Sequence, residues 1–550
     1  MRLPALRSTL QDLSSPTVLL AMLLALLLAV PVLVVAGSVF VGGTGETWSH
    51  LAQTVLGEFL RNTLMMMLSV GIGVAVIGVA TAWLTSMTDF PGRRVFEWAL
   101  VLPLAMPAYV LAYVYTDFLQ FVGPVQSWLR EAFEWRRGDY WFPDVRSVGG
   151  ACVMFVLVLY PYVYMLARSA FLARSASLQD AARSLGLGPW GSFLRVSLPL
   201  ARPAIVAGVS LALMETLADF GTVSYFAVQT FTTGIFRAWF SLGDRIAAAQ
   251  LSAALLGFVA LVLLFERLSR GRARHSAGPR TPAATPTRLR GLAALGAWLV
   301  CALPLTLGFV LPAGLLLRMA LNEGDAQFGP RYLELLQNSL FVSAVAAVLA
   351  VALAVVFAYG ARMASSRLPS ALNRVVALGY ALPGAVIAVG ILIPVTRLDV
   401  ALAELIRSLS GQNPGLLLTG GIAALVYAYL VRFLTVALGS VESGLARITP
   451  TMDEAARNLG TTRLGVLRRV HWPLLRGSLL TAGLLVFVDV MKELPATLVI
   501  RPFNFDTLAT QAYTLAADER LAEAATAALA IVVAGLLPVI LLSRRIGRTR

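Results

Sequence analysis

The stretch DAARSLGLGPWGSFLRVSLP, residues Asp180–Pro199, has a counterpart later in the chain, EAARNLGTTRLGVLRRVHWP, residues Glu454–Pro473. Each copy begins with an acidic residue and two alanines, and each has a glycine six positions and a proline 19 positions after the acid. The copies lie 274 positions apart, each between apolar segments. A polar loop that recurs in an apolar chain predicts two equivalent docking sites, here called sockets, for a partner protein that binds as a symmetric pair.

The composition is that of a membrane protein. Of the 550 residues, 58% are hydrophobic and 13% charged, whereas soluble domains are about 25% charged, and the mean hydropathy is +0.78. The net charge of +15 does not indicate nucleic-acid binding, because the arginines fall in short loops rather than on one solvated face. Cys152 and Cys301 lie within apolar runs and are predicted to be buried side chains rather than metal ligands or a disulfide.

Twelve apolar runs are long enough, at about 20 residues, to cross a bilayer as helices. They lack the period-two alternation of a barrel strand. The predicted spans are residues 17–41, 61–85, 97–121, 149–171, 201–220, 247–267, 291–317, 336–361, 372–396, 415–438, 475–497 and 521–543. The first is longer than a signal-peptide core of about 7–15 residues, so we expect an uncleaved anchor.

Arginines gather before the first span and after the even-numbered spans. Positive charge marks cytoplasmic loops. The loop over residues 123–147 is mixed, with arginines and acids together. The pattern predicts that both termini and both motif copies face the cytoplasm.

The duplication extends beyond the motif. Asn62 matches Asn338 and Pro107 matches Pro383, both at an offset of 276. Internal repeats are typical of transporters, and an even number of spans per half makes the two halves parallel. The sequence thus predicts an all-α polytopic membrane protein with about 12 transmembrane helices in two parallel six-helix repeats. The predicted domains are an N-terminal segment with the first span (1–57), the first repeat (58–267), a Pro- and Arg-rich cytoplasmic linker with the seventh span (268–335), the second repeat (336–543) and a basic cytoplasmic tail (544–550).

Each motif copy is predicted to fold as a helix, a turn and a second helix. In each copy four apolar residues share one helical face: Leu178, Ala181, Ala182 and Leu185, then Met452, Ala455, Ala456 and Leu459. We expect Ser177 and Thr451 to cap the first helix, Gly186 and Gly460 to end it at positive φ, and Pro199 and Pro473 to stand in the first turn of the next span. The alternative is a pair of interfacial helices without a partner.

The arrangement of acid, Ala-Ala, Gly and Leu-Pro resembles the coupling loop of type-1 ABC importer permeases. The resemblance covers nearly the whole chain as two permease domains, over 58–267 and 336–543. It implies that Asp180, Ala181, Ala182, Glu454, Ala455 and Ala456 contact a cytoplasmic ATPase, with Gly186, Gly460, Pro199 and Pro473 shaping the loops. Asp180 replaces the usual Glu and Trp472 the usual Leu, so we expect two sockets of unequal strength.

Four longer strings are similar to fused permeases of the ferric-iron uptake group. They are Leu217–Val223, Gln229–Ile235, Lys492–Thr497 and Arg501–Thr510. The resemblance implies a permease of the bacterial cytoplasmic (inner) membrane that moves iron(III) inward by alternating access, with an extracytoplasmic iron-binding protein and two copies of an ATPase. Fused permeases for thiamine, polyamines, sulfate and phosphonates share the coupling loop and remain alternatives.

Ionisable residues at membrane depth are candidates for function. The 274 offset pairs Glu215 with Asp489 and Asp219 with Glu493, and Lys492 is the only lysine in the chain. We expect the two acids of each half to lie on one helical face and to line the translocation path. The alternative is structural: Lys492 pairs with an acid of the other half, and the remaining acids cap helix ends.

Six tyrosines offer oxygen ligands of the kind that iron(III) favours: Tyr109, Tyr113, Tyr115, Tyr160, Tyr162 and Tyr164. Aromatic anchors at the membrane interface are the alternative. No metal site is firmly assigned, because His50, His275 and His471 are scattered along the chain.

The sequence contains no Gly-x-x-x-x-Gly-Lys-Ser/Thr phosphate loop, so no catalytic residue or cofactor is assigned and ATP is expected to be used by a partner. Two rival classes remain: a secondary transporter, which would leave the paired motif unexplained, and a scaffold or receptor, which would leave the buried acids unexplained.

Overall fold

The computed structural model describes residues 16–42, 44–172, 184, 186, 188–270, 286–322, 329–363, 368–446 and 448–548. The chain divides into two compact units that do not follow sequence order. Unit 1 comprises Met1–Gly45, Ile235–Ala253 and Phe328–Thr510, and unit 2 comprises Glu46–Gly234, Ala254–Gln327 and Gln511–Arg550.

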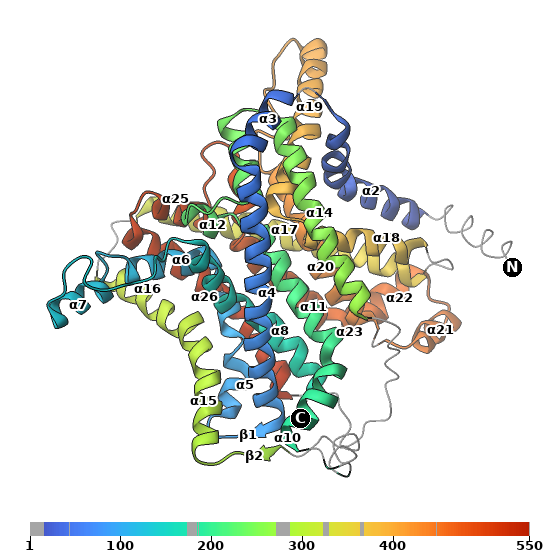
Figure 1. The fold of residues 1–550 in the computed structure, drawn as a ribbon. Coiled ribbons are helices and arrows are strands. Elements are labelled where there is room, and N and C mark those ends of the chain that lie inside the picture. The colour runs from blue at the N-terminus through green and yellow to red at the C-terminus, as the bar shows by residue number, and fades with distance from the viewer. Residues whose placement is uncertain are drawn as a thin grey trace. The chain divides into compact units, whose positions relative to one another are not determined.

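Helices make up most of both units (Figure 1). Up to residue 270 they are α2 (Pro16–Gly37), α3 (Gly45–Thr54), α4 (Leu56–Met87), α5 (Arg93–Ala99), α6 (Ala108–Leu119), α7 (Pro124–Phe133), α8 (Val148–Leu172), α10 (Pro189–Ser192), α11 (Leu198–Ala218), α12 (Gly221–Tyr225), α13 (Phe231–Phe236) and α14 (Arg245–Arg270). From residue 286 they are α15 (Leu292–Leu305), α16 (Leu311–Asn322), α17 (Pro330–Met363), α18 (Leu368–Val376), α19 (Gly384–Ser410), α20 (Ala423–Leu445), α21 (Pro450–Asn458), α22 (Arg463–Val466), α23 (Trp472–Met491), α24 (Pro495–Ile500), α25 (Leu508–Ala517) and α26 (Leu521–Arg548).

Short 3₁₀ or π-helical turns join several of these helices: η1 (Ser38–Phe40), η2 (Leu102–Ala105), η3 (Phe193–Ser197), η4 (Arg237–Ser241), η5 (Thr306–Val310), η6 (Ala377–Ala381) and η7 (Leu467–His471). Strands β1 (Thr88–Asp89) and β2 (Thr287–Arg288) form one parallel pair, with Thr88 opposite Thr287.

The all-α polytopic class is confirmed. Among the described residues, 11 helices are long and apolar enough to cross a membrane, or up to 12 if the bent pair Arg93–Ala105 and Ala108–Phe133 is one span. The prediction of a continuous helix over 97–121 is wrong, because the chain bends by 91° within that pair. Proline lacks an N–H and disfavours helix in the residue before it. Pro107 and Pro383 accordingly precede the first residues of α6 and α19, and the predicted span over 372–396 is divided as well.

Each unit is built on three packed helices from one repeat. In unit 2, α8 packs against α4 and α11, and glycines permit the close approach that is common between membrane helices. A Cβ atom on Gly78 would lie 2.6 Å from Cβ of Val163, and one on Gly208 would lie 2.7 Å from Cα of Val163. In unit 1 the corresponding helices α17, α20 and α23 also pack together.

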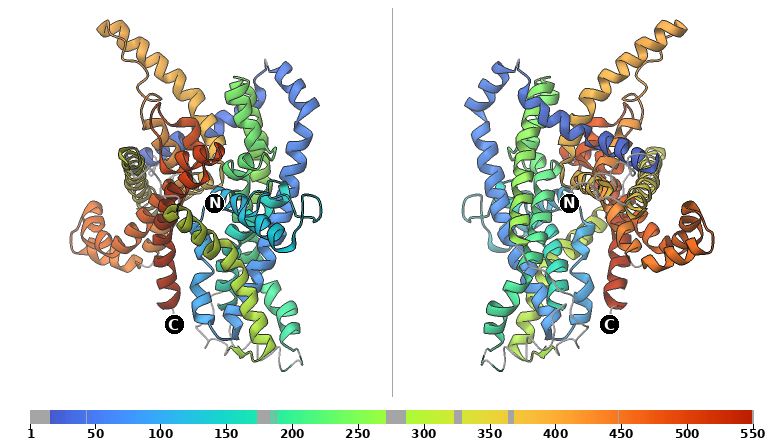
Figure 2. Two further views of the ribbon diagram at one scale, coloured as in Figure 1. Left: turned by 90° about the vertical axis from the view of Figure 1, so that its left-hand side faces the viewer. Right: turned by 90° about the vertical axis from the view of Figure 1, so that its right-hand side faces the viewer.

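The first and seventh spans join the unit of the opposite repeat. In unit 1, α2 packs against α18 and α19, and the Tyr427 hydroxyl donates to the carbonyl of Leu27. In unit 2, the Tyr115 hydroxyl donates to the carbonyl of Leu307 at 2.6 Å. Figure 2 shows the yellow-green α15 beside the blue α5, with which it is in contact. Helix α16 packs against α26, the last span.

The duplication is visible in matching hydrogen bonds. Asn62 Nδ2 donates to the carbonyl of Gln229 at 2.9 Å, and Asn338 Nδ2 donates to the carbonyl of Asp506 at 3.1 Å. The residue after each carbonyl, Thr230 or Thr507, donates its N–H to a threonine hydroxyl three positions on. Each bond ties a spanning helix to the start of a short helix, α13 or α25, so the two repeats share this local geometry.

Candidate functional site

The first motif copy is only partly described. Ser177, Asp180, Ala181 and Ala182 lie outside the described residues. Gly186 is exposed and has φ of 76°, which confirms the expected left-handed turn. Pro199 stands in the first turn of α11, as predicted.

The second copy forms an exposed helix, α21. Glu454 and Ala455 are exposed, and the Leu459 side chain after the helix is 84% exposed. Gly460 has φ of 80°, and Pro473 stands in the first turn of α23. The helix begins at Pro450, so Thr451 lies inside it and the prediction that Thr451 caps it is wrong. In both copies a π-helical turn, η3 or η7, leads into the next span.

A buried network that the sequence did not reveal anchors α21. Asp453, one residue before the motif acid, accepts from Arg362 Nε at 2.9 Å, and its Oδ1 lies 2.7 Å from His471 Nε2. The Arg362 guanidinium also donates to the carbonyls of Leu445 and Ile448 at the end of α20. The network therefore ties α21 to α17, α20 and η7. The first motif copy has Gln179 and Ser197 at the positions that correspond to Asp453 and His471. This difference between the copies is the feature of the sequence from which the network could have been suspected.

The electrostatics of Asp453 follow from these contacts. Burial by itself raises the pKa of the Asp453 carboxyl, but hydrogen bonds from Arg362 and His471 and the Arg362 charge outweigh it and hold that pKa below its usual range. The carboxylate is therefore ionised at neutral pH, where it binds the guanidinium most strongly.

The four acids at membrane depth do not lie on continuous helical faces. Helix α11 ends at Ala218 and α23 at Met491, so Asp219 and Glu493 lie beyond the helix ends, contrary to the prediction. Only Glu215 and Asp489 lie within the helices. Lys492 pairs with Asp489 of its own half, with 2.9 Å between Nζ and Oδ1, rather than with an acid of the other half.

Asp219 and Glu493 each start the next short helix. Asp219 Oδ1 accepts from the N–H groups of Thr222 and Val223 at 2.9 and 3.3 Å. Glu493 accepts from the N–H groups of Ala496 and Thr497 at 2.9 and 3.0 Å. A carboxylate at a helix N-terminus satisfies backbone donors that have no partner within the helix.

The two caps differ in their charge environment. Glu493 Oε1 lies 3.2 Å from Arg432 Nη1, and both side chains are buried. At the 274 offset the position of Arg432 is occupied by Val158 in the first repeat. Among the described residues, Asp219 has no arginine, lysine or histidine within ion-pair distance.

The six predicted tyrosines fall into different environments. Tyr109, Tyr113, Tyr115, Tyr160 and Tyr164 are buried, whereas Tyr162 is half-buried. The Tyr115 and Tyr164 hydroxyls donate to the carbonyls of Leu307 and Glu97. Tyr113 contacts Tyr225 edge to face, with ring centroids 5.5 Å apart. Tyr225 was not singled out from the sequence.

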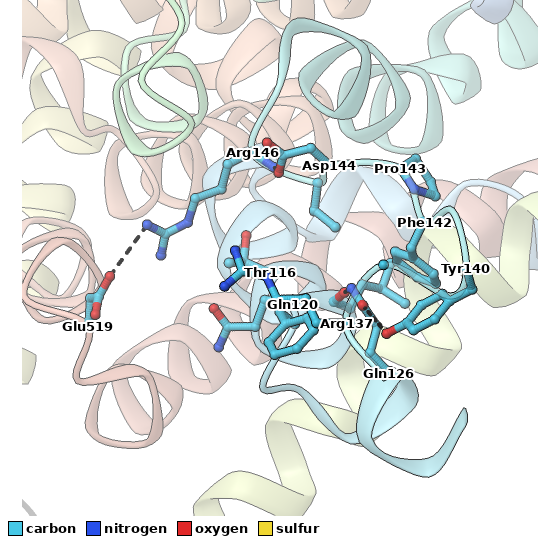
Figure 3. A pocket seen from close by; sticks show the side chains of 14 residues that line it. Thr116, Gln120, Gln126, Arg137, Tyr140, Phe142, Pro143, Asp144, Arg146 and Glu519 are labelled. Atoms are coloured by element: carbon cyan, nitrogen blue, oxygen red, sulfur yellow. Dashed lines mark hydrogen bonds and ion pairs between the residues drawn. The ribbon is translucent and has the colours of Figure 1, made fainter. Parts of the chain in front are cut away.

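A polar cavity of about 460 Å³ opens in unit 2 between the loop after α7 and the residues before α26 (Figure 3). Its lining includes Thr116, Gln126, Tyr140, Arg146 and Glu519. Arg146 Nη1 pairs with Glu519 Oε1 at 3.4 Å, and Arg146 Nη2 donates to the Tyr225 hydroxyl at 3.3 Å. Arg146 thus joins the cavity wall to Tyr225.

Within the described part of the chain, no three His, Cys, Asp or Glu side chains are grouped to hold a metal ion. His50 is exposed and His471 is buried in the Asp453 network, while His275 lies outside the described residues. Cys152 and Cys301 are buried free thiols.

Comparisons with known proteins identify relatives of both halves. The profile of the family described as "Binding-protein-dependent transport system inner membrane component" matches residues 75–274 and again 350–549. The Fe(3+)-transport system permease protein FbpB 2 of Haemophilus influenzae is 26% identical over 537 residues, which cover 96% of this chain and 97% of that protein. The probable sulfate transport system permease protein cysT of Chlorokybus atmophyticus is 32% identical over 182 residues, covering 32% of this chain and 59% of the relative. The molybdenum transport system permease protein ModB of Escherichia coli K12 is 28% identical over 212 residues, which cover 36% of this chain and 87% of that protein.

Proposed function

Because this chain belongs to the family of binding-protein-dependent transport system inner membrane components, we propose that it is the permease subunit of an ATP-driven importer that moves iron(III) into the cytoplasm. The observation that carries the proposal is the exposed helix α21, which is followed by the left-handed Gly460 in a motif that occurs twice in the sequence. An exposed helix tied to three other helices suits the transfer of motion from a partner.

Two motif copies suit two copies of a cytoplasmic ABC ATPase. Asp180, Ala181 and Ala182 would contact one copy, and Glu454, Ala455 and Ala456 the other. This assignment requires both motifs and both termini to face the cytoplasm, as the arginine distribution predicts. ATP binding and hydrolysis in the partner would drive alternating access through the two motifs.

Iron(III) is favoured over other substrates by the extent of the similarity. The iron-permease relative aligns over nearly all of both chains, whereas the sulfate and molybdenum permease relatives align with about a third of this chain. An extracytoplasmic iron-binding protein would deliver the ion. The proposed path residues are Glu215, Asp219, Asp489, Lys492 and Glu493. The four acids of this set still outnumber the two cations paired with them, Lys492 and Arg432, and this excess of negative charge favours a cationic substrate over an oxyanion.

Uptake of radioactive iron tests the proposal. The chain would be expressed together with a candidate partner ATPase and a candidate iron-binding protein. The host would be a bacterial strain that lacks its own iron(III) importers. We expect ATP-dependent accumulation of iron that excess thiamine, polyamine, sulfate or molybdate does not reduce. Accumulation of one of those competitors in place of iron would reject iron(III) as substrate, and uptake that persists without the ATPase would favour a secondary transporter.

The two motif glycines provide a matched pair of variants. Gly186→Val and Gly460→Val each force a β-branched residue into the left-handed region, at a cost of about 1–2 kcal/mol. Within the described part of the chain, a Cβ atom at either position would meet no atom within 4 Å beyond the adjacent residues, so the expected strain is in the turn itself. We expect both variants to reduce iron uptake, and to unequal extents because the sockets differ. Equal losses, measured as initial uptake rates at matched expression, would contradict the asymmetry.

A further inference from the structure

The difference between Asp219 and Glu493 indicates a site for a cation. Buried charges in proteins are paired with an opposite charge, coordinate a metal ion or become neutral through a shift in their pKa. Glu493 is neutralised by Arg432 at 3.2 Å. Asp219 makes the same type of helix cap, but it has only Thr222 and Val223 as hydrogen-bond partners among the described side chains and backbone groups around its carboxylate. The first repeat therefore holds a half-buried carboxylate that has no positively charged side chain within ion-pair distance among the described residues.

A buried phenol packs against the short helix α12 that Asp219 starts. The Tyr113 side chain is 2% exposed, and its hydroxyl has no hydrogen-bond partner among the described residues. The Tyr113 ring packs against the rings of Tyr109 and Tyr225, with centroids 5.8 and 5.5 Å apart. A buried hydroxyl without a hydrogen-bond partner is destabilising, and this one lies in a group of packed phenol rings.

The cluster draws residues from both sequence repeats but lies in one structural unit. Tyr113 is on α6, Asp219 precedes α12, Tyr225 ends α12, and Tyr513 is on α25, all within unit 2. The Tyr513 hydroxyl is hydrogen-bonded to Ser224 Oγ at 2.8 Å, and its ring packs on Phe220 with centroids 5.8 Å apart. These contacts bring a residue of the second repeat against the short helix that Asp219 starts.

The cavity adjoins the cluster through Arg146 and Tyr225. Tyr225 receives a hydrogen bond from Arg146, whose guanidinium also lies 4.9 Å from the Tyr225 ring centroid. Arg146 and Thr116 line the cavity, and Figure 3 shows Arg146 reaching toward Glu519. On its other side Tyr225 contacts Tyr113. Tyr225 therefore lies between the open cavity and the buried phenol.

We propose that Tyr113, Tyr225, Tyr513 and Asp219 form a transient coordination site for iron(III) on its way through the permease. The inference rests on the proposed iron transport. Iron(III) is a hard cation, and hard cations prefer carboxylate and other oxygen donors. Each phenol that binds exchanges its O–H bond for an iron–oxygen bond and releases its proton to water in the cavity. No electron is transferred.

This set of residues is not duplicated between the two repeats. In the second repeat, Val389 occupies the position that corresponds to Tyr113, 276 residues further along the chain. In the first repeat, Phe236 occupies the position that corresponds to Tyr513, at the offset of 277 residues that also relates Thr230 to Thr507. Glu493, the counterpart of Asp219, already binds Arg432. A single asymmetric site suits one ion moving through one path.

Phenylalanine variants test the site with a matched control. Tyr113→Phe and Tyr225→Phe each remove one oxygen of the proposed site. Tyr160→Phe is the control, because Tyr160 lies on α8, outside the cluster. Its hydroxyl is as buried as that of Tyr113 and also has no hydrogen-bond partner among the described residues. The full chain in lipid nanodiscs would be titrated with iron(III)-nitrilotriacetate while the visible phenolate-to-iron charge-transfer band is recorded. Uptake of radioactive iron would be measured in cells in parallel.

We expect the wild type and Tyr160→Phe to show the band and equal uptake. Tyr113→Phe and Tyr225→Phe should lose most of the band and at least about tenfold in iron affinity. Asp219→Asn, which keeps an acceptor for the helix cap, should do the same. Reaction of the buried Cys152 and Cys301 with a thiol dye reports folding of unit 2, because a misfolded variant would expose them.

Iron uptake by a folded Tyr113→Phe variant at the rate of Tyr160→Phe, with an unchanged band, would overturn the site and leave the proposed function standing. Absence of the band in a wild type that transports iron would also overturn the site alone. A wild type that moves sulfate or molybdate and no iron would overturn both.

Discussion

Replacing Arg432 by methionine is expected to destabilise the protein by about 3–5 kcal/mol, the range found when one partner of a buried ion pair is removed. The Glu493 side chain is 2% exposed, and Arg432 Nη1 lies 3.2 Å from its Oε1. Without the guanidinium, three hydrogen bonds from Ala496 and Thr497 remain to the carboxylate, but its buried charge is uncompensated. Loss of the monodisperse peak after heating, followed by fluorescence-detected size exclusion in detergent, measures the change.

The double variant Arg432→Met with Glu493→Gln separates charge from packing. The introduced glutamine side chain would keep an oxygen for the helix cap but carry no charge, so the double variant should recover part of the loss. Arg520→Met provides an exposed control, because Arg520 pairs with Glu523 at the surface and exposed pairs contribute little. A single Arg432→Met variant as stable as Arg520→Met would show that Glu493 does not depend on the arginine.

Much of the architecture could be predicted because the repeat constrains it. The matching strings around Asn62 and Asn338 predicted corresponding spans, and both asparagines donate to the carbonyl before a short helix. Gly186 and Gly460 were predicted to be left-handed on chemical grounds, and both are. These features depend on local sequence, which a duplicated chain shows twice.

Features set by contacts between distant residues could not be predicted. The partner of Glu493 is Arg432, 61 positions away, and the sequence around Glu493 does not point to it. The acids Asp219 and Glu493 were placed on helices because apolar runs do not show where a helix ends inside the membrane. That α2 packs on the second repeat was equally hidden, since lipid-facing and helix-facing surfaces are similarly apolar.

The same limit applied to the tyrosines. Tyr113 was a candidate because of its residue type, but the sequence offered no reason to group it with Tyr225 and Tyr513, which lie far along the chain. Both side chains are buried, but the Tyr113 hydroxyl has no hydrogen-bond partner among the described residues, whereas the Tyr115 hydroxyl donates to the carbonyl of Leu307. Only the fold separates a structural phenol from a candidate ligand.

Replacing Asp453 by glutamine, the residue at the corresponding position of the first motif copy, is expected to loosen α21 and reduce iron uptake. The change removes an ionised acceptor that binds Arg362 at 2.9 Å and His471 at 2.7 Å. Hydrogen bonds to charged groups contribute about 1.5–3 kcal/mol. A loss of one or two kcal/mol changes a two-state ratio by about 5–30-fold, so we expect the anchored population of α21 and the uptake rate to fall several-fold.

The pH dependence identifies the carboxylate as the cause. Folding lowers the pKa of Asp453, so its contribution is complete above the pKa of about 3.9 that the group has when unfolded and is lost as pH falls through the folded value. The wild type should therefore lose this stability in acid, while Asp453→Gln should lack it at every pH. Thermal stability measured from neutral to acidic pH gives both curves, and parallel curves would exclude Asp453 as the acid-sensitive group.

Glu454→Gln, on the next residue, distinguishes anchoring from docking. Glu454 is exposed on α21 and is the motif acid proposed to meet the ATPase, so its substitution should weaken ATPase binding without lowering the thermal stability of the permease. Asp453→Gln should lower stability first and coupling as a consequence. If both variants lower stability equally, α21 is held by its whole polar face rather than by the Asp453 network. If neither affects uptake, the second motif copy does not transmit the motion of the ATPase.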